Sequence, residues 1–129
     1  VDIAGISYPK TYNGHDIQPM EGKSLVGAIN NQPIQRDFIF WEHEGNRAIK
    51  AGPWKLVSKT EKNKVFTEKD QNAWELYNLE LDPSETNNLA SQYTSKVQEL
   101  ALLWEKEAFR TKALPWPWDK KIKKPTNSN

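Results

Sequence analysis

The sequence contains no cysteine, which excludes disulfide bonds, thiolate metal sites and cysteine nucleophiles within this chain. It has no apolar run near the roughly 18–20 residues that a membrane-spanning helix needs, and no signal-peptide pattern is visible. A net charge is almost absent too, because 18 basic residues are balanced by 17 acidic ones. We therefore expect neither a membrane nor a nucleic acid as a partner.

Histidine is scarce as well, since His15 and His43 are the only two in the chain. A zinc site needs three or four converging ligands, so we expect no metal site in this chain. Aromatic side chains, in contrast, are abundant, with six Trp, four Tyr and four Phe in 129 residues. A chain of this length fits one domain, and this aromatic load can fill a compact core.

Four short segments have the aromatic, β-branched or alternating pattern of strands, and they are residues 38–43, 47–51, 54–58 and 73–79. Turn signals at Gly45 and at Gly52-Pro53 separate the first three segments, which predicts an antiparallel meander. Residues 59–72 are mostly polar and are expected to form a long exposed connection to the fourth strand.

Helices are expected in three places. Residues 24–29 can form a short helix, and Asp82-Pro83 followed by Glu85 should open a helical turn that ends near residues 87–88. Apolar residues at helical spacing predict a long helix over residues 95–112, with Ser95 and Gln98 as a capping box. The stripe consists of Val97, Leu100, Ala101, Leu103, Trp104 and Ala108. The fold is thus expected to be α+β, with a four-stranded antiparallel sheet packed against one long C-terminal helix.

Core-forming residues and polar groups meet most closely in residues 36–58. The polar turn in this stretch offers four candidate binding residues, which are His43, Glu44, Asn46 and Arg47. In a strand, Glu42 and Glu44 share one face while His43 takes the other, so the three do not converge. No nucleophile stands beside His43 that would make it a general base. Two interpretations remain, a hydrogen-bonded turn between two strands or the rim of a pocket for a polar ligand.

Four tryptophans, Trp41, Trp54, Trp74 and Trp104, could form a platform on which sugars stack. Aromatic residues in strands and on a helix stripe more often belong to the core, and a core is the expectation here. Two prolines in residues 114–118 exclude a helix there, and we expect this segment to pack in an extended form. Residues 119–129 are basic and polar and are expected to be a solvated tail.

The order of these motifs resembles the C-terminal subdomain of the arylsulfatase-like sulfatases, which depend on formylglycine. Three segments carry the resemblance: GISYPKTYNGHDIQPMEGKSLVGAI, RDFIFWEHEGNRAIKAGPWKLV and WELYNLELDPSETNNLA. The last of them is the most specific. The resemblance implies a linker over residues 1–35 that leads from a missing catalytic domain, a subdomain over residues 36–118 and a tail over residues 119–129. Residues 1–6 lack a Met and read like the last turn of a helix, which also favours a piece of a longer protein over a mature terminus.

For the full-length enzyme, the resemblance implies hydrolysis of a sulfated sugar or aryl sulfate by a formylglycine nucleophile and a calcium ion. Neither the nucleophile motif nor the acidic calcium ligands have a counterpart here. The nearest sequence, Ser7-Tyr8-Pro9-Lys10-Thr11, lacks the required Arg. We therefore expect no catalytic residue in this chain and no turnover by the chain alone. A bacterial source and a periplasmic or extracellular location are further expectations from the resemblance.

The resemblance also suggests roles for residues and surfaces. The loop after the first strand of this subdomain can reach the substrate, which favours His43 as a binding residue, with Glu44, Asn46 and Arg47 beside it. An apolar docking face for the N-terminal catalytic domain is expected on one face of the sheet and at Ile3, Ile6, Tyr8 and Tyr12, and a homodimer could also cover it. The alternative to this interpretation is a free-standing carbohydrate-binding or protein-interaction module.

Overall fold

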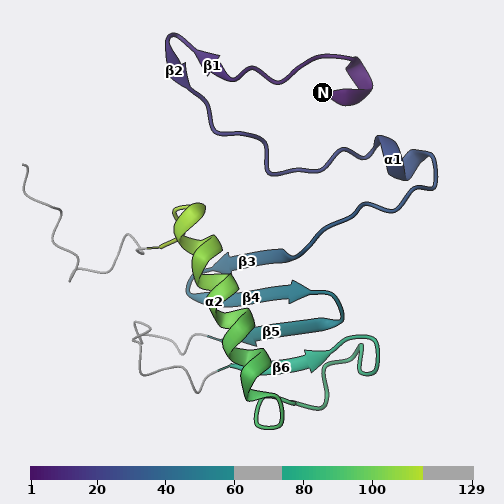
Figure 1. The fold of residues 1–129 in the computed structure, drawn as a ribbon, viewed down its shortest axis with the longest axis vertical. Helices are drawn as coiled ribbons and strands as arrows, with labels where there is room; N and C mark the ends of the chain where they lie inside the picture. Colours follow the sequence, from purple (N-terminus) through teal and green to yellow (C-terminus); the bar gives the residue numbers. More distant parts are fainter. Residues whose placement is uncertain (60–73, 115–129) are drawn as a thin grey trace, which may run out of the picture. The chain divides into compact units, whose positions relative to one another are not determined.

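The computed structural model describes residues 1–59 and 74–114. The chain divides into two compact units, Val1–Arg36 and Asp37–Asn129 (Figure 1). Three of the sequence predictions fall on segments outside the described residues: the connection over residues 59–72, the extended segment over residues 114–118 and the tail over residues 119–129. Of these segments, the structure describes only Lys59 and Leu114.

The first unit has little regular structure and no buried residue. Its elements are η1 (Asp2–Ala4), β1 (Thr11–Tyr12), β2 (His15–Asp16) and α1 (Val26–Ile29). Only Ile17 and Gly27 are half-buried, and every other residue of this unit is exposed. The apolar side chains of Ile3, Ile6, Tyr8 and Tyr12 are among the exposed ones.

The second unit contains a four-stranded antiparallel sheet in the order β3-β4-β5-β6. The strands are β3 (Ile39–His43), β4 (Asn46–Ala51), β5 (Trp54–Ser58) and β6 (Glu75–Asn78). Tight turns join the first three strands, because Gly45 and Gly52 adopt the positive φ values of 83° and 54° that these turns need. The predicted meander is therefore confirmed.

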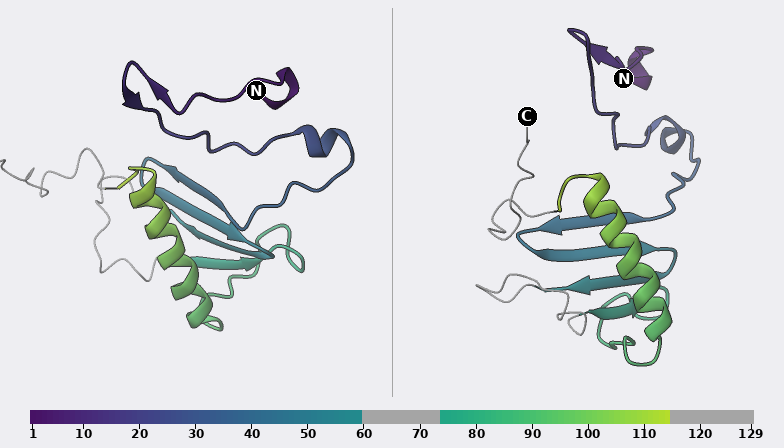
Figure 2. Two further views of the ribbon diagram at one scale, coloured as in Figure 1. Left: turned by 45° about the horizontal axis from the view of Figure 1, so that its top comes forward. Right: turned by 60° about the vertical axis from the view of Figure 1, so that its left-hand side comes forward.

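The long helix α2 (Thr94–Arg110) crosses one face of this sheet (Figures 1 and 2). A row of apolar side chains lies beneath it, because the strand register aligns Phe40, Ile49, Leu56 and Leu76. The helix contributes Leu100, Trp104 and Ala108 to the same core. Burying one such large apolar side chain stabilises a fold by about 1.5–3 kcal/mol. The α+β fold with a sheet packed on one long C-terminal helix is thus confirmed.

Two details of the helix predictions are wrong. Helix α2 begins at Thr94 after Tyr93, and no side chain caps it, so the capping box predicted at Ser95 does not form. The segment after Asp82 is a turn and not a helix, because Glu85 has a φ of 55° that a right-handed helix cannot contain. Asp82 still accepts hydrogen bonds as a cap would, from the backbone N–H groups of Thr86 and Asn87, both at 2.8 Å.

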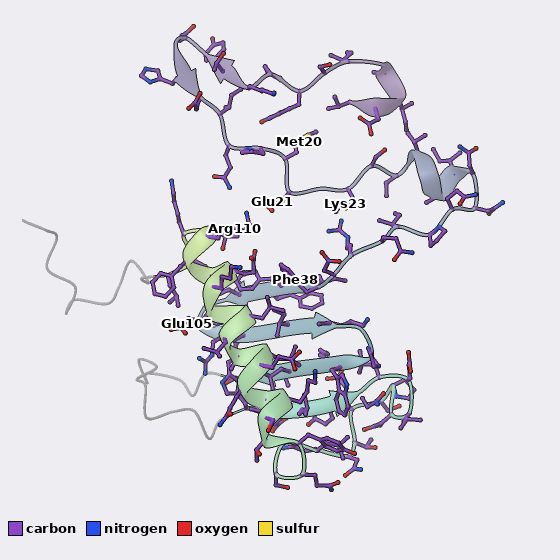
Figure 3. The ribbon with its side chains drawn as sticks, in the orientation of Figure 1. Met20, Glu21, Lys23, Phe38, Glu105 and Arg110 are labelled. Atoms are coloured by element: carbon purple, nitrogen blue, oxygen red, sulfur yellow. The ribbon has the colours of Figure 1, made fainter. Side chains whose placement is uncertain are left out.

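Phe38 and the ion pair of Arg110 with Glu107 lie at the edge of the core. Phe38, directly before β3, packs against the buried cluster (Figure 3). In the last turn of α2, Arg110 donates a hydrogen bond from Nε to the buried Glu107 carboxylate at 2.7 Å. This ion pair provides a buried acid with a partner in the last turn of α2, where a basic residue is favoured by the helix dipole. Within the described part of the chain, no helix combines the length and apolar character needed to cross a membrane.

Candidate functional site

The turn between β3 and β4 holds three of the four candidate binding residues. His43 pairs with Asn46 across the end of the hairpin, which leaves Glu44 and Gly45 as the two turn residues. Their φ values of 51° and 83° are those of a type I′ turn. This turn type matches the right-handed twist of the strands, so it projects from the sheet in a defined direction.

Two side-chain hydrogen bonds fix the turn. The Glu42 carboxylate accepts a bond from the backbone N–H of Gly45 at 2.9 Å. The Asn46 side-chain amide donates to the backbone carbonyl of His43, also at 2.9 Å. The side chains of His43 and Glu44 are exposed beyond this framework. The turn can therefore present an imidazole and a carboxylate to a ligand while its backbone stays in place.

Arg47 does not join the other three. It follows Asn46 on β4 and turns to the side of the sheet that α2 covers. Its Nη2 donates a hydrogen bond to the Ser58 hydroxyl at 3.1 Å. Its guanidinium carbon lies 4.2 Å from the ring centre of Trp74 and 5.4 Å from that of Trp104, within cation–π range. The structure thus brings His43, Glu44 and Asn46 together and holds Arg47 behind them, against the core.

The four tryptophans also divide into those that belong to the core and one that is exposed. Trp54, Trp74 and Trp104 belong to the core or pack on it, as expected. Trp41 does not, because its side chain is 45% exposed on the outer face of the sheet. Trp41 and His43 are two residues apart on β3 and so point to the same side. The predicted core position of Trp41 is therefore wrong, and the alternation of Trp41 with Phe40 along the strand is the sequence signal that the two side chains face opposite sides of the sheet.

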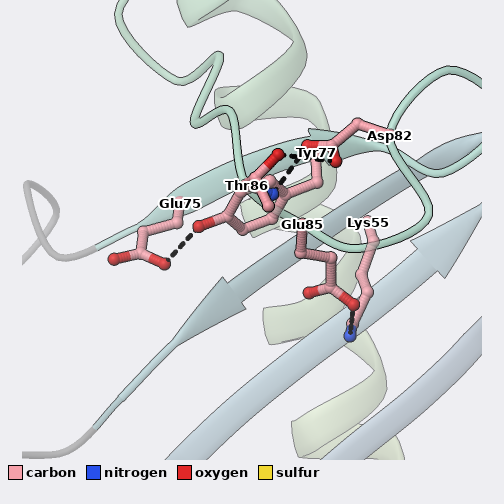
Figure 4. A network of polar contacts seen from close by, with 6 residues as sticks. All are labelled: Lys55, Glu75, Tyr77, Asp82, Glu85 and Thr86. Atoms are coloured by element: carbon pink, nitrogen blue, oxygen red, sulfur yellow. Dashed lines mark hydrogen bonds and ion pairs between the residues drawn. The ribbon is translucent and has the colours of Figure 1, made fainter.

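A polar network lies on the outer side of β5 and β6 (Figure 4). Lys55 and Glu85 form an ion pair at 2.6 Å, and the Tyr77 hydroxyl donates to the Glu75 carboxylate at 2.7 Å. This hydrogen bond, together with burial and nearby carboxylates, raises the pKa of Tyr77 to about 12. Hydrogen bonds from Asn87 and Thr86 lower the pKa of Asp82. Because Tyr77 stays protonated and Asp82 ionised at neutral pH, these two groups act as fixed hydrogen-bonding partners that hold a loop.

Residues 1–59 and 74–114 contain no group of three or more His, Asp or Glu side chains that could hold a metal ion. The site is therefore a rigid, exposed turn with hydrogen-bonding side chains and an aromatic ring beside it. Such a surface can bind and orient a ligand.

No protein-family model matches the chain. It is similar to an uncharacterized sulfatase of Schizosaccharomyces pombe, with 31% identity over 81% of this chain. It is also similar to a sulfatase of Formosa agariphila, with 28% identity over 74% of this chain, and to arylsulfatase K of Xenopus laevis, with 28% identity over 78%. Because the relatives include eukaryotic proteins, these matches do not favour the bacterial source expected from the sequence.

Among solved structures, the chain is similar to a sulfatase of Bacteroides thetaiotaomicron, studied in work on the metabolism of multiple glycosaminoglycans. The two are 26% identical with a TM-score of 0.52, over 70% of this chain and 21% of that one. The chain spans only 18–19% of the length of the three relatives above. Sequence and fold therefore agree: the chain belongs to the sulfatases and corresponds to a C-terminal part of their much longer members.

Proposed function

We propose that this chain is the C-terminal subdomain of a sulfuric ester hydrolase, where it completes the fold and forms part of the rim around the substrate. The observation that carries the proposal is the β3–β4 turn. Its backbone is fixed by Glu42 and Asn46, while the side chains of His43 and Glu44 remain exposed. A rim residue needs this combination of a rigid support and an accessible hydrogen-bonding group.

In this proposal, His43 binds a part of the substrate that carries no sulfate. Its imidazole can donate one hydrogen bond and accept another, which suits the hydroxyl groups of a sugar. Glu44 can accept from a second hydroxyl, and Asn46 holds the turn. Arg47 supports the hairpin from the core side through Ser58 and the two indole rings. None of these residues takes part in breaking the sulfate ester bond.

The reaction itself would belong to the larger part of the enzyme. Formylglycine arises in the family from a Cys or Ser motif that this sequence lacks, and the described residues offer no metal-binding cluster. Formylglycine therefore does not fit this sequence, calcium does not fit the residues that the structure describes, and the proposal assigns no step of hydrolysis to this chain. The partner would be the N-terminal catalytic domain, and the substrate a sulfated sugar or an aryl sulfate. A periplasmic or extracellular location remains part of the proposal.

The proposal is tested with the longer protein that contains this chain. His43→Ala should raise KM for a sulfated oligosaccharide by roughly 2- to 10-fold with little change in kcat, because one hydrogen bond made equally in ground and transition states is lost. KM for a small aryl sulfate should change less. The chain alone should not hydrolyse either substrate. Hydrolysis by the chain alone would refute the proposal, and so would a longer protein without sulfatase activity.

The alternative module, which binds carbohydrates by itself, is favoured by the exposed ring of Trp41 next to His43. Calorimetric titration of the 129-residue chain with neutral and sulfated oligosaccharides separates the two functions. A detached rim should bind neither ligand appreciably. Binding that disappears in Trp41→Ala but not in the matched variant Tyr93→Ala, another exposed aromatic residue, would establish the module.

A further inference from the structure

The two edge strands of the sheet, β3 and β6, differ in whether other segments bond to their outward backbone groups. The loop after β6 covers the edge of that strand, because the backbone N–H of Leu89 donates to the carbonyl of Leu76 at 2.8 Å. The Asn88 side chain accepts from the N–H of Leu76 at 3.1 Å. Both outward backbone groups of Leu76 are therefore satisfied within the unit. Natural proteins protect sheet edges in this manner because an open edge pairs with other chains.

The edge of β3 has no such cover within residues 37–59 and 74–114. In a two-residue hairpin the pair that flanks the turn, here His43 and Asn46, is hydrogen-bonded. By alternation, Ile39 and Trp41 also direct their backbone groups toward β4. Phe40 and Glu42 then direct their N–H and C=O groups away from the sheet. Among the described residues, no strand pairs with this side of β3, and no backbone hydrogen bond reaches Phe40 or Glu42 there.

The sequence of β3 carries few of the devices that block pairing, since its one acidic side chain, Glu42, is bound by the backbone N–H of Gly45 in the adjacent turn. Its five residues, Ile39–His43, include no proline, no lysine and no glycine. Two of its side chains, Ile39 and Trp41, are 39% and 45% exposed on the outer face. An open backbone edge and an exposed apolar face thus coincide on the same strand. Each alone is common, but together they are typical of a surface that another segment covers.

We infer that the outer edge of β3 is a strand-addition site, at which an extended segment from the larger N-terminal part of the sulfatase pairs with Phe40 and Glu42 and covers Ile39 and Trp41. This inference rests on the proposed function. The relatives extend over about five times the length that this chain matches, so the same polypeptide would supply the segment. A tethered segment acts at a high effective concentration, whereas a second copy of the chain must pay the full entropic cost of association.

Amide hydrogen exchange tests the inference with an internal control. In the 129-residue chain alone, the N–H groups of Phe40 and Glu42 should exchange much faster than those of Ile39 and Trp41, which are bonded to β4. In the longer sulfatase, the N–H groups of Phe40 and Glu42 should exchange about 100-fold more slowly than in the chain alone. Slow exchange of both groups in the monomeric chain would overturn the inference. Protection that appears only when the chain dimerises would overturn it in favour of a second copy.

A pair of variants isolates the outward N–H of Glu42. Glu42→Ala and Glu42→Pro both lose the carboxylate that accepts from Gly45, but only the proline also removes the N–H. The two variants should melt within about 2 °C of each other in the chain alone. In the longer protein, the proline variant should melt several degrees lower than the alanine variant. Equal melting of the two variants in the longer protein would refute strand addition. The proposed function is judged separately on the longer protein without substitutions, because absence of sulfatase activity there would refute that function.

Discussion

The indole N–H of Trp104 donates a hydrogen bond to the backbone carbonyl of Trp41 at 2.9 Å, across 63 positions in the sequence. Trp104 is only 2% exposed, and its ring also lies 5.5 Å from the ring centre of Phe40 and 6.1 Å from that of Trp74. One side chain of α2 therefore fixes both the apolar face and the backbone of β3. The position of the candidate site depends on this contact, because β3 leads directly into the turn.

Replacing Trp104 should lower the stability of the second unit. Trp104→Phe removes the hydrogen bond and part of the ring, and we expect a loss of about 1–2 kcal/mol in the free energy of unfolding. Trp104→Ala should cost about 3–5 kcal/mol. Urea denaturation followed by circular dichroism measures both. Trp41→Phe is the matched control, because it keeps the backbone carbonyl and changes a half-exposed ring, so an equal loss in the two Phe variants would contradict this account.

The sheet could be predicted from the sequence because its signals are local. The Trp54–Ser58 strand was predicted with its observed bounds, since the alternation and the Gly52 turn both lie within a few residues. The predicted start of α2 is wrong, because Ser95 could cap the helix only if the helix began two residues later, at Lys96. The prediction of a helical turn after Asp82 is wrong for a different reason. Glu85 adopts a positive φ and pairs with Lys55, a partner 30 positions away that no local pattern reveals.

The candidate site was predictable in part. The exposure of His43 on the opposite face from Glu42 follows from strand alternation alone, and the Glu44-Gly45 turn follows from the residue types. The place of Arg47 does not, because its stacking on Trp74 and Trp104 requires β6 and α2 to be in position. The sequence pattern therefore predicts one site from residues that the structure separates. Arg47 lies at the edge of the core, whereas His43, Glu44 and Asn46 belong to the exposed turn.

Arg47 should matter for stability more than His43 does. Arg47→Lys keeps the charge but loses the planar group that lies against two indole rings, so the free energy of unfolding should fall by about 1–2 kcal/mol. Ser58→Ala, which removes the hydroxyl acceptor of Arg47, should cost about 1 kcal/mol. His43→Ala, at an exposed position, should stay within about 0.5 kcal/mol of the parent chain. Urea denaturation of the three variants decides this, and a silent Arg47→Lys would show that the guanidinium contacts contribute nothing.

The β3–β4 turn contains a residue in a conformation that its side chain disfavours. Glu44 has a φ of 51°, in the left-handed region that Asn adopts more readily. Glu44→Asn should therefore stabilise the chain by about 0.5 kcal/mol, and Gly45→Ala should destabilise it by about 1–2 kcal/mol. Gly22→Ala is the control, because Gly22 has no positive φ and open space around it, and it should be nearly neutral. If Gly45→Ala were as neutral as Gly22→Ala, the assigned turn type would be wrong.

Tyr77 should titrate at a higher pH than an ordinary tyrosine. Its hydrogen bond to Glu75 and its burial raise its pKa from 10.0 to about 12, so the folded state favours the neutral phenol. The resulting stabilisation is fully present below pH 10 and is lost as the pH rises through 12. Ultraviolet absorbance of tyrosinate during an alkaline titration should resolve one late group, which Tyr77→Phe removes. Glu75→Gln should bring the midpoint back toward 10, because the charged acceptor is gone. An unchanged midpoint in Glu75→Gln would mean that burial and the charges of Glu85 and Asp82, and not Glu75, set the pKa of Tyr77.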